Sequence, residues 1–72
     1  IDELGMTLAY LKRALKAITN ALDATGHCEQ ENLLDANQAK EVRHRIFQIR
    51  DGIISLMGAF RTEWRRRYGH GG

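Results

Sequence analysis

Apolar residues recur along the first third of the chain at alternating steps of three and four positions. These residues are Ile1, Leu4, Leu8, Leu11, Leu15, Ile18 and Leu22. With about 100° of rotation per residue they fall within an arc of about 100°, the narrow stripe of a coiled-coil contact. Thr25-Gly26 then suits a helix end, because glycine readily takes the left-handed conformation found there. The pattern predicts a first helix over residues 2–24.

The residues that follow are predicted to form a connecting segment and the start of a second helix. Residues 25–35 contain no sustained hydrophobic period, so we predict a connecting segment. Asp35 and Gln38 are spaced for a capping box, in which each side chain accepts a hydrogen bond from the other residue's backbone amide. We therefore predict a second helix over residues 36–67, followed by a flexible tail over residues 68–72.

The second helix carries a broader apolar surface than the first. Its three-four steps fall on Ala39, Val42, Ile46, Ile49, Ile53, Leu56 and Phe60. Four further residues, Phe47, Ile54, Met57 and Trp64, widen this stripe to an arc of about 180°. A single neighbouring helix needs only a narrow stripe, so the second helix is expected to meet two neighbours. The candidate partner interface comprises Ile46, Phe47, Ile53, Ile54, Met57 and Trp64.

These elements predict an all-α fold: one antiparallel two-helix hairpin over residues 1–72, which dimerises into a four-helix bundle. A chain of 72 residues rarely gains more than about 3–5 kcal/mol from its own core, so association is a common remedy. The bundle resembles, in architecture only, the small RNA-binding hairpin dimers of plasmid copy control.

The composition is ordinary, but the charged residues are distributed unevenly between the two halves of the chain. Hydrophobic residues make up 43% of the chain and charged residues 28%, which is typical of a globular protein. Residues 1–36 contain six acidic and three basic residues, a balance of −3, whereas residues 37–72 contain three acidic and eight basic residues, a balance of +5. The second half is therefore the candidate for contact with anions.

Basic and aromatic residues gather at the end of the second helix. The candidate anion or nucleic-acid contacts are Arg43, Arg50, Arg61, Arg65, Arg66 and Arg67, with Trp64 and Tyr68 available for stacking on bases. The alternative is a solvated helix end whose cations face the negative end of the helix dipole. Arg43 and Arg50 lie seven positions apart on one face, and there we expect an ion pair to a carboxylate of the first helix or of a partner.

Small residues also recur on the second helix, at Gly52, Ser55, Gly58 and Ala59. Each glycine costs a helix about 1 kcal/mol relative to alanine. Close approach of another helix would explain this composition, and so would ordinary sequence drift.

The remaining chemistry is sparse. His27-Cys28 is an adjacent pair without a second pair at zinc spacing, so we expect no metal site and no cofactor. The opening Ile1-Asp2-Glu3-Leu4 resembles the start of the helical chorismate mutases, a resemblance that would imply an enzyme. Gly5 stands where that family has an arginine, and the resemblance ends there, so we expect no enzyme.

The expected function is that of a small non-catalytic helical interaction module, a regulator, adaptor or chaperone-like protein that works as a homodimer or docks on a larger protein. The alternative is a nucleic-acid-binding regulator that uses the arginine-rich half. The longest mostly apolar run, residues 53–60, is shorter than the roughly 20 residues of a membrane span. This run, the single cysteine and the lack of a signal pattern point to a cytoplasmic protein without membrane contact.

Overall fold

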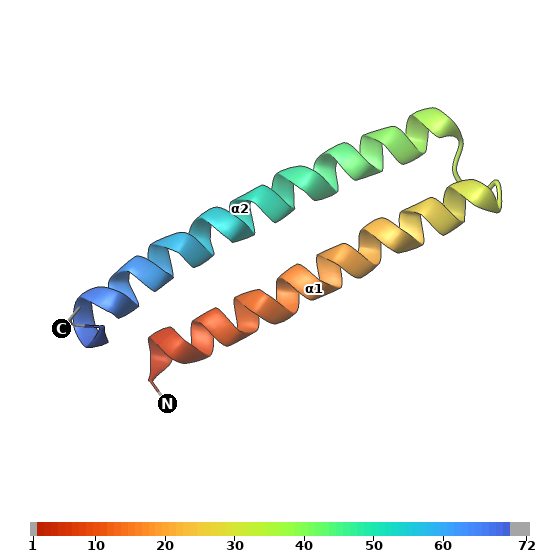
Figure 1. Ribbon diagram of the computed structural model, residues 1–72. Helices are drawn as coiled ribbons and strands as arrows, with labels where there is room; N and C mark the ends of the chain where they lie inside the picture. The colour runs from red at the N-terminus through yellow and green to blue at the C-terminus, as the bar shows by residue number, and fades with distance from the viewer. Residues whose placement is uncertain (1, 70–72) are drawn as a thin grey trace.

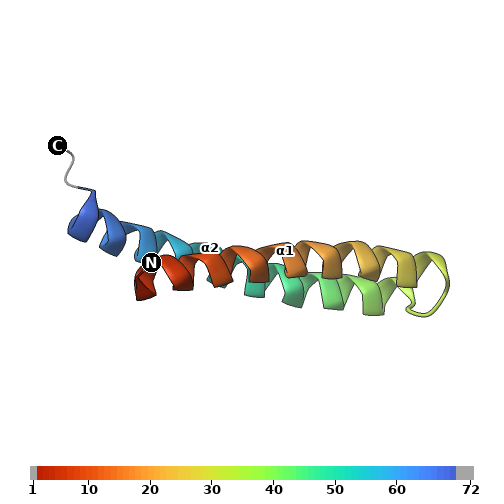
Figure 2. The same ribbon diagram turned by 90° about the horizontal axis from the view of Figure 1, so that it is seen from below.

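The computed structural model describes residues 2–69, which form two long helices and one turn (Figure 1). Helix α1 runs over Glu3–Gln30 and helix α2 over Ala36–Tyr68. The two helices lie side by side and antiparallel in both views (Figures 1 and 2). The molecule measures 54 × 18 × 17 Å, the dimensions of a single helix pair. The predicted all-α hairpin is confirmed.

Both helices begin at an aspartate whose side chain satisfies a free backbone amide. The Asp2 carboxylate accepts a hydrogen bond from the Gly5 amide at 2.7 Å. At α2 the predicted capping box is confirmed: the Gln38 amide donates to Asp35 Oδ1 at 2.8 Å, and the Asp35 amide donates to Gln38 Oε1 at 3.0 Å.

The predicted end of the first helix at Gly26 is wrong. Helix α1 continues through Gly26 to Gln30, and the residue with a left-handed backbone is Asn32, at φ 61°. The Leu33 amide donates to the Cys28 carbonyl at 2.8 Å and the Asn32 amide donates to the Glu29 carbonyl at 3.1 Å. These two bonds form a Schellman motif with asparagine in the position that glycine usually takes. The connection shortens to residues 31–35.

The end of α2 differs by one residue from the prediction. Tyr68 belongs to the helix and not to the predicted tail, and the Gly69 amide donates to the Arg65 carbonyl at 2.9 Å. Residues 70–72, the rest of that predicted tail, lie outside the described residues. In Figure 2 this end of α2 extends beyond the start of α1.

The interface between the helices follows the predicted stripe on α1, and on α2 it follows five of the seven predicted positions. The leucines and isoleucine of the α1 stripe from Leu4 to Leu22 are all half-buried. On α2, Ile49 and Leu56 are exposed, although both belong to the apolar stripe with three-four steps that the sequence pattern identified. Arg50 is half-buried and Met57 buried in their place. The side of α2 that meets α1 is thus rotated by about 40° from the centre of the predicted stripe, less than half of the roughly 100° step between successive residues.

The hydrophobic core is thin. Ala39 and Met57, with 0% and 5% of their surface exposed, are the fully buried apolar residues among residues 2–69. Thr25 is the buried polar residue, and its hydroxyl donates to the Ala21 carbonyl at 2.8 Å. Each helix has one neighbour, so most apolar side chains keep one side in water. Within residues 2–69, neither helix is both long and apolar enough to cross a membrane.

Candidate protein-binding surface

Exposed apolar side chains lie on both sides of the line along which α2 meets α1. On one side are Phe47 and Ile54, with 44% and 45% of their surface exposed. The helical rotation places Arg43, Arg50 and Arg61 on the same side. We call this surface, formed by Phe47, Ile54 and these three arginines, the basic flank.

The second exposed surface lies on the opposite side of that line. Ile49 and Leu56 are 55% and 47% exposed, and Gly52 and Ala59 alternate with them along the helix. We call these four residues the small-residue flank. The sequence pattern identified Gly52 and Ala59 as small residues that close approach of another helix would explain, but it counted Ile49 and Leu56 in the main apolar stripe of the second helix. The alternation of large and small residues was the available signal.

The six residues of the predicted partner interface divide into two groups. Ile46 and Ile53 are half-buried and Met57 is buried, so these three contribute to the contact between α2 and α1. Phe47, Ile54 and Trp64 are exposed. The structure does not bring all six together on one free surface, because α1 covers the middle of the broad apolar arc.

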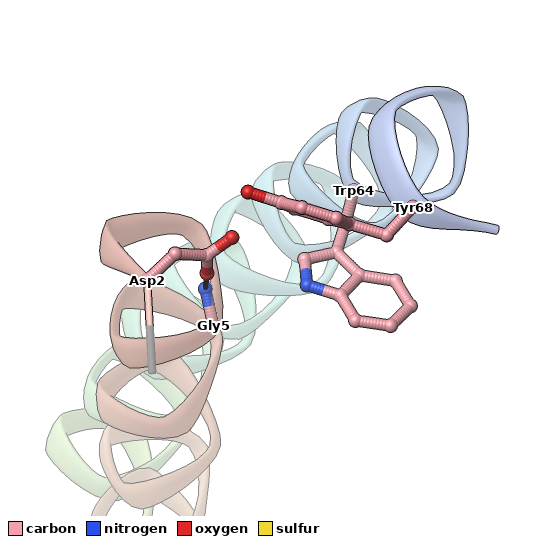
Figure 3. A pocket seen from close by; sticks show the side chains of 4 residues that line it. All are labelled: Asp2, Gly5, Trp64 and Tyr68. Carbon is pink, nitrogen blue, oxygen red and sulfur yellow. Dashed lines mark hydrogen bonds between the residues drawn. The ribbon is translucent and has the colours of Figure 1, made fainter.

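The open end of the hairpin holds a shallow hollow lined by Asp2, Gly5, Trp64 and Tyr68 (Figure 3). The Trp64 and Tyr68 rings lie 5.4 Å apart, with their planes tilted by 48°. Both aromatic residues stay exposed at the end of α2 that extends past α1. The arrangement leaves apolar ring surface in water at this end.

The Tyr68 phenol points toward the Asp2 carboxylate in this hollow (Figure 3). Hydrogen bonding with Tyr68, and then with the Gly5 amide, lowers the pKa of Asp2 below its ordinary value of 3.8. The same interaction with the Asp2 carboxylate raises the pKa of Tyr68 above 10.0. These two residues therefore join the start of α1 to the end of α2.

Two arginines lie beside the contact between the helices. Arg43 donates from Nη2 to Glu29 Oε1 at 2.6 Å, so the predicted ion pair to an acid of the first helix is confirmed for this arginine. The acid belongs to the part of α1 beyond the predicted helix end. Arg50 is half-buried, and it has no ion-pair partner within residues 2–69.

Some of the arginines near the end of α2 form ion pairs with an acid of the same helix. The carboxylate of Glu63 accepts hydrogen bonds from Arg66 and Arg67, which lower its pKa below the ordinary 4.5. Arg61 and Arg65 have no ion pair to any residue in the described range 2–69. The predicted anion-contact residues therefore differ in whether an acid of the described range already pairs with their charge.

The metal-ligating and thiol side chains are the remaining candidates for chemistry. Among residues 2–69, no three histidine, cysteine, aspartate or glutamate side chains gather where they could hold a metal ion. Cys28 is a half-buried free thiol on α1, beside the exposed His27.

Comparison with known proteins returned no family match. No family model matches this chain, and no curated protein or solved structure is significantly similar to it.

Proposed function

We propose that this protein is a small non-catalytic helical interaction module that works inside an assembly. The assembly is a homodimer forming a four-helix bundle, or a hairpin docked on a larger protein that it regulates, adapts or chaperones. The partner binds the exposed apolar side chains of α2.

One observation carries this proposal: the hairpin leaves large apolar side chains exposed on both sides of the contact between α1 and α2. Phe47, Ile49, Ile54 and Leu56 are each more than two-fifths exposed, whereas only Ala39 and Met57 are buried apolar residues in the described range. Exposed large apolar side chains that share a surface, as Phe47 and Ile54 do on one side and Ile49 and Leu56 on the other, are typical of interaction sites. Arg50 adds to this, because a half-buried guanidinium group favours a carboxylate partner.

Sedimentation of the chain at micromolar concentration tests the proposal, together with helicity measured by circular dichroism. We expect a species of two chains, and a thermal midpoint that rises with chain concentration because association stabilises the folded form. The paired changes Phe47→Asp/Ile54→Asp and Ile49→Asp/Leu56→Asp place charges on the two flanks separately. At least one pair should abolish association, since an unpaired charge in an apolar interface costs several kcal/mol.

Ser55→Asp is the matched control, because Ser55 is an exposed position on the same helix and outside both flanks. It should leave the sedimentation and the midpoint unchanged. A fully helical monomer at every concentration, indifferent to both paired changes, would contradict the homodimer and leave only docking on another protein.

A nucleic-acid-binding regulator is the second proposal. Arg61 and Arg65 support it, because they are exposed, unpaired within residues 2–69 and adjacent to the exposed ring of Trp64. Arginine neutralises phosphates while aromatic rings stack on bases.

A further inference from the structure

We infer that a second copy of this chain packs on the small-residue flank, with the two α2 helices antiparallel and a two-fold axis at the level of Ile54. This inference rests on the proposed function and specifies the homodimer. It assigns the interface to residues outside the partner interface predicted from the sequence, which comprises Ile46, Phe47, Ile53, Ile54, Met57 and Trp64.

The small-residue flank continues in both directions into one straight stripe of α2. Its positions follow each other at steps of four, three, four, three and four residues: Arg45, Ile49, Gly52, Leu56, Ala59 and Glu63. At about 100° per residue they occupy an arc of about 80°, the width of a helix–helix contact. Large and small residues alternate in the centre, with the positive charge of Arg45 at one end and the negative charge of Glu63 at the other.

An antiparallel second copy matches this stripe to itself. A two-fold axis at the level of Ile54 places position 49 opposite position 59 of the second copy, and position 52 opposite position 56. Ile49 then faces an alanine and Leu56 faces a glycine, so that large side chains fill the space above small ones. The space exists, because a Cβ added at Gly52 would meet no atom within 4 Å other than those of its own helical backbone and its chain neighbours.

The charges fit the same axis. Position 45 comes opposite position 63, which brings Arg45 of each chain to Glu63 of the other. Each of these residues already belongs to a local ion pair: Arg45 Nε donates to Glu41 at 2.9 Å, and Glu63 accepts from Arg66 and Arg67. At each end of the antiparallel contact, the ion pair that contains Arg45 in one chain therefore lies beside the ion pairs that contain Glu63 in the other. A parallel arrangement would set Arg45 against its own copy and Glu63 against its own copy, which is repulsive.

The basic flank does not offer this match. Self-contact through Phe47 and Ile54 brings arginines 43, 50 and 61 of one chain near the same arginines of the other. Of these, Arg43 is neutralised by Glu29, whereas Arg50 and Arg61 have no acid within residues 2–69. Like charges opposite one another disfavour this arrangement for a second copy.

The exposed area is large enough for such a dimer. The chain exposes 5637 Å², whereas a compact protein of 8.2 kDa exposes about 4,500 Å². The excess of about 1,100 Å² exceeds the roughly 800 Å² that each partner buries in a standard stable interface.

Helix α1 allows the close approach. Leu4 lines a shallow hollow together with Ala59, Phe60 and Glu63, so this side of α1 lies beside the small-residue flank. Three, ten and seventeen residues further along, the same side of α1 carries Thr7, Ala14 and Ala21. Small side chains at this seven-residue spacing let the second copy come near α2 without meeting bulk from α1.

A charge exchange between positions 45 and 63 tests the register. The two residues are 18 positions apart on one helix, about 27 Å, so they cannot pair within a chain. We expect Arg45→Glu and Glu63→Arg each to raise the dimer dissociation constant by about tenfold or more, and the double variant to return it to within about threefold of the original. Sedimentation measures the constants, and circular dichroism at high chain concentration verifies that each variant is helical.

Disulfide formation tests the direction of the helices and does not depend on the charge variants. In a Cys28→Ser background, Ile49→Cys and Ala59→Cys chains are oxidised separately and as a mixture. The antiparallel dimer places positions 49 and 59 opposite each other but sets the two copies of position 49 about 15 Å apart along the axis. The mixture should cross-link rapidly and each single chain should not.

Gly52→Leu and Gly58→Leu form a matched pair, because both glycines lie in α2 with open space around them and only Gly52 belongs to the stripe. Gly52→Leu should raise the dissociation constant by about tenfold or more, since it fills the space for Leu56, and Gly58→Leu should not. A dimer whose dissociation constant does not change in the charge variants would overturn this inference. So would a dimer that cross-links when either cysteine variant is oxidised alone. Both outcomes would leave the proposed function standing. A chain that remains monomeric throughout would remove both the inference and the homodimer.

Discussion

Asn32 ends α1 with a backbone conformation that few side chains adopt readily. Its φ of 61° places it in the left-handed region, and its amide and that of Leu33 satisfy two carbonyls of the last helical turn. Asn32→Ala should lower the free energy of unfolding by about 1 kcal/mol, because alanine is strained there. Asn32→Gly should leave it unchanged or raise it. Urea unfolding of both variants at one chain concentration provides the comparison, and equal losses in both would show that the asparagine side chain itself matters.

The contact between Asp2 and Tyr68 makes the open end of the hairpin dependent on pH. The pKa of Asp2 is lowered, so its contribution to stability is present above its unfolded pKa, near 3.8, and is lost as the pH falls through the folded value. The pKa of Tyr68 is raised, so its contribution is present below its unfolded pKa, near 10.0, and is lost as the pH rises through the folded value. The contact is therefore complete between these limits.

Tyr68→Phe should shift the pKa of Asp2 upward, although not fully to its ordinary value, because the Gly5 amide still donates to the carboxylate. Titration of the Asp2 carboxyl by nuclear magnetic resonance measures this shift directly. Tyr10→Phe is the control, since Tyr10 lies on the outer side of α1 beside Arg13. An unchanged Asp2 pKa in Tyr68→Phe would show that the phenol does not interact with this carboxylate.

At the scale of the helices, hydrophobic spacing predicted which segments are helical but not where α1 ends. Gly26 is a plausible stop by its own preference, yet a mid-helix glycine costs only about 1 kcal/mol. The turn beyond it half-buries Cys28 and Glu29, and Glu29 binds Arg43. These tertiary contacts outweigh the local preference, and they depend on α2, which local sequence signals around Gly26 do not include.

Spacing also predicted the width of the apolar arc on α2 but not its orientation. A stripe through Ile49 and Leu56 and a stripe through Arg50 and Met57 are neighbours on the same helix, and both follow three-four steps. The structure takes the second, in which Arg50 is half-buried. The apolar stem of an arginine packs against neighbours while its charge remains near water, a property that a count of apolar residues omits. This is why the predicted partner interface includes Ile46, Ile53 and Met57, which pack against α1, and omits the exposed Ile49 and Leu56.

At the scale of the whole molecule, the two flanks differ in the partners they suit. The small-residue flank has a neutral centre and one charge of each sign at its ends, so it matches a copy of itself. The basic flank combines exposed Phe47 and Ile54 with arginines, so it suits a partner that carries carboxylates or phosphates. A dimer formed through the first flank leaves two copies of the second exposed, an arrangement that fits an adaptor.

Salt dependence distinguishes nucleic acid from an acidic protein on this basic surface. If the chain binds a single-stranded oligonucleotide, the logarithm of the binding constant falls with the logarithm of salt concentration by about 0.7 for each phosphate neutralised. Arg61→Gln/Arg65→Gln should then reduce the slope by about 1.4, because these arginines have no acid within residues 2–69. Arg66→Gln/Arg67→Gln should change it less, because Glu63 forms an ion pair with both and offsets one of their two charges. For an interaction module that binds proteins alone, we expect no measurable binding of the oligonucleotide even at low salt. Tight binding with a steep slope that only the first pair reduces would favour the nucleic-acid-binding regulator.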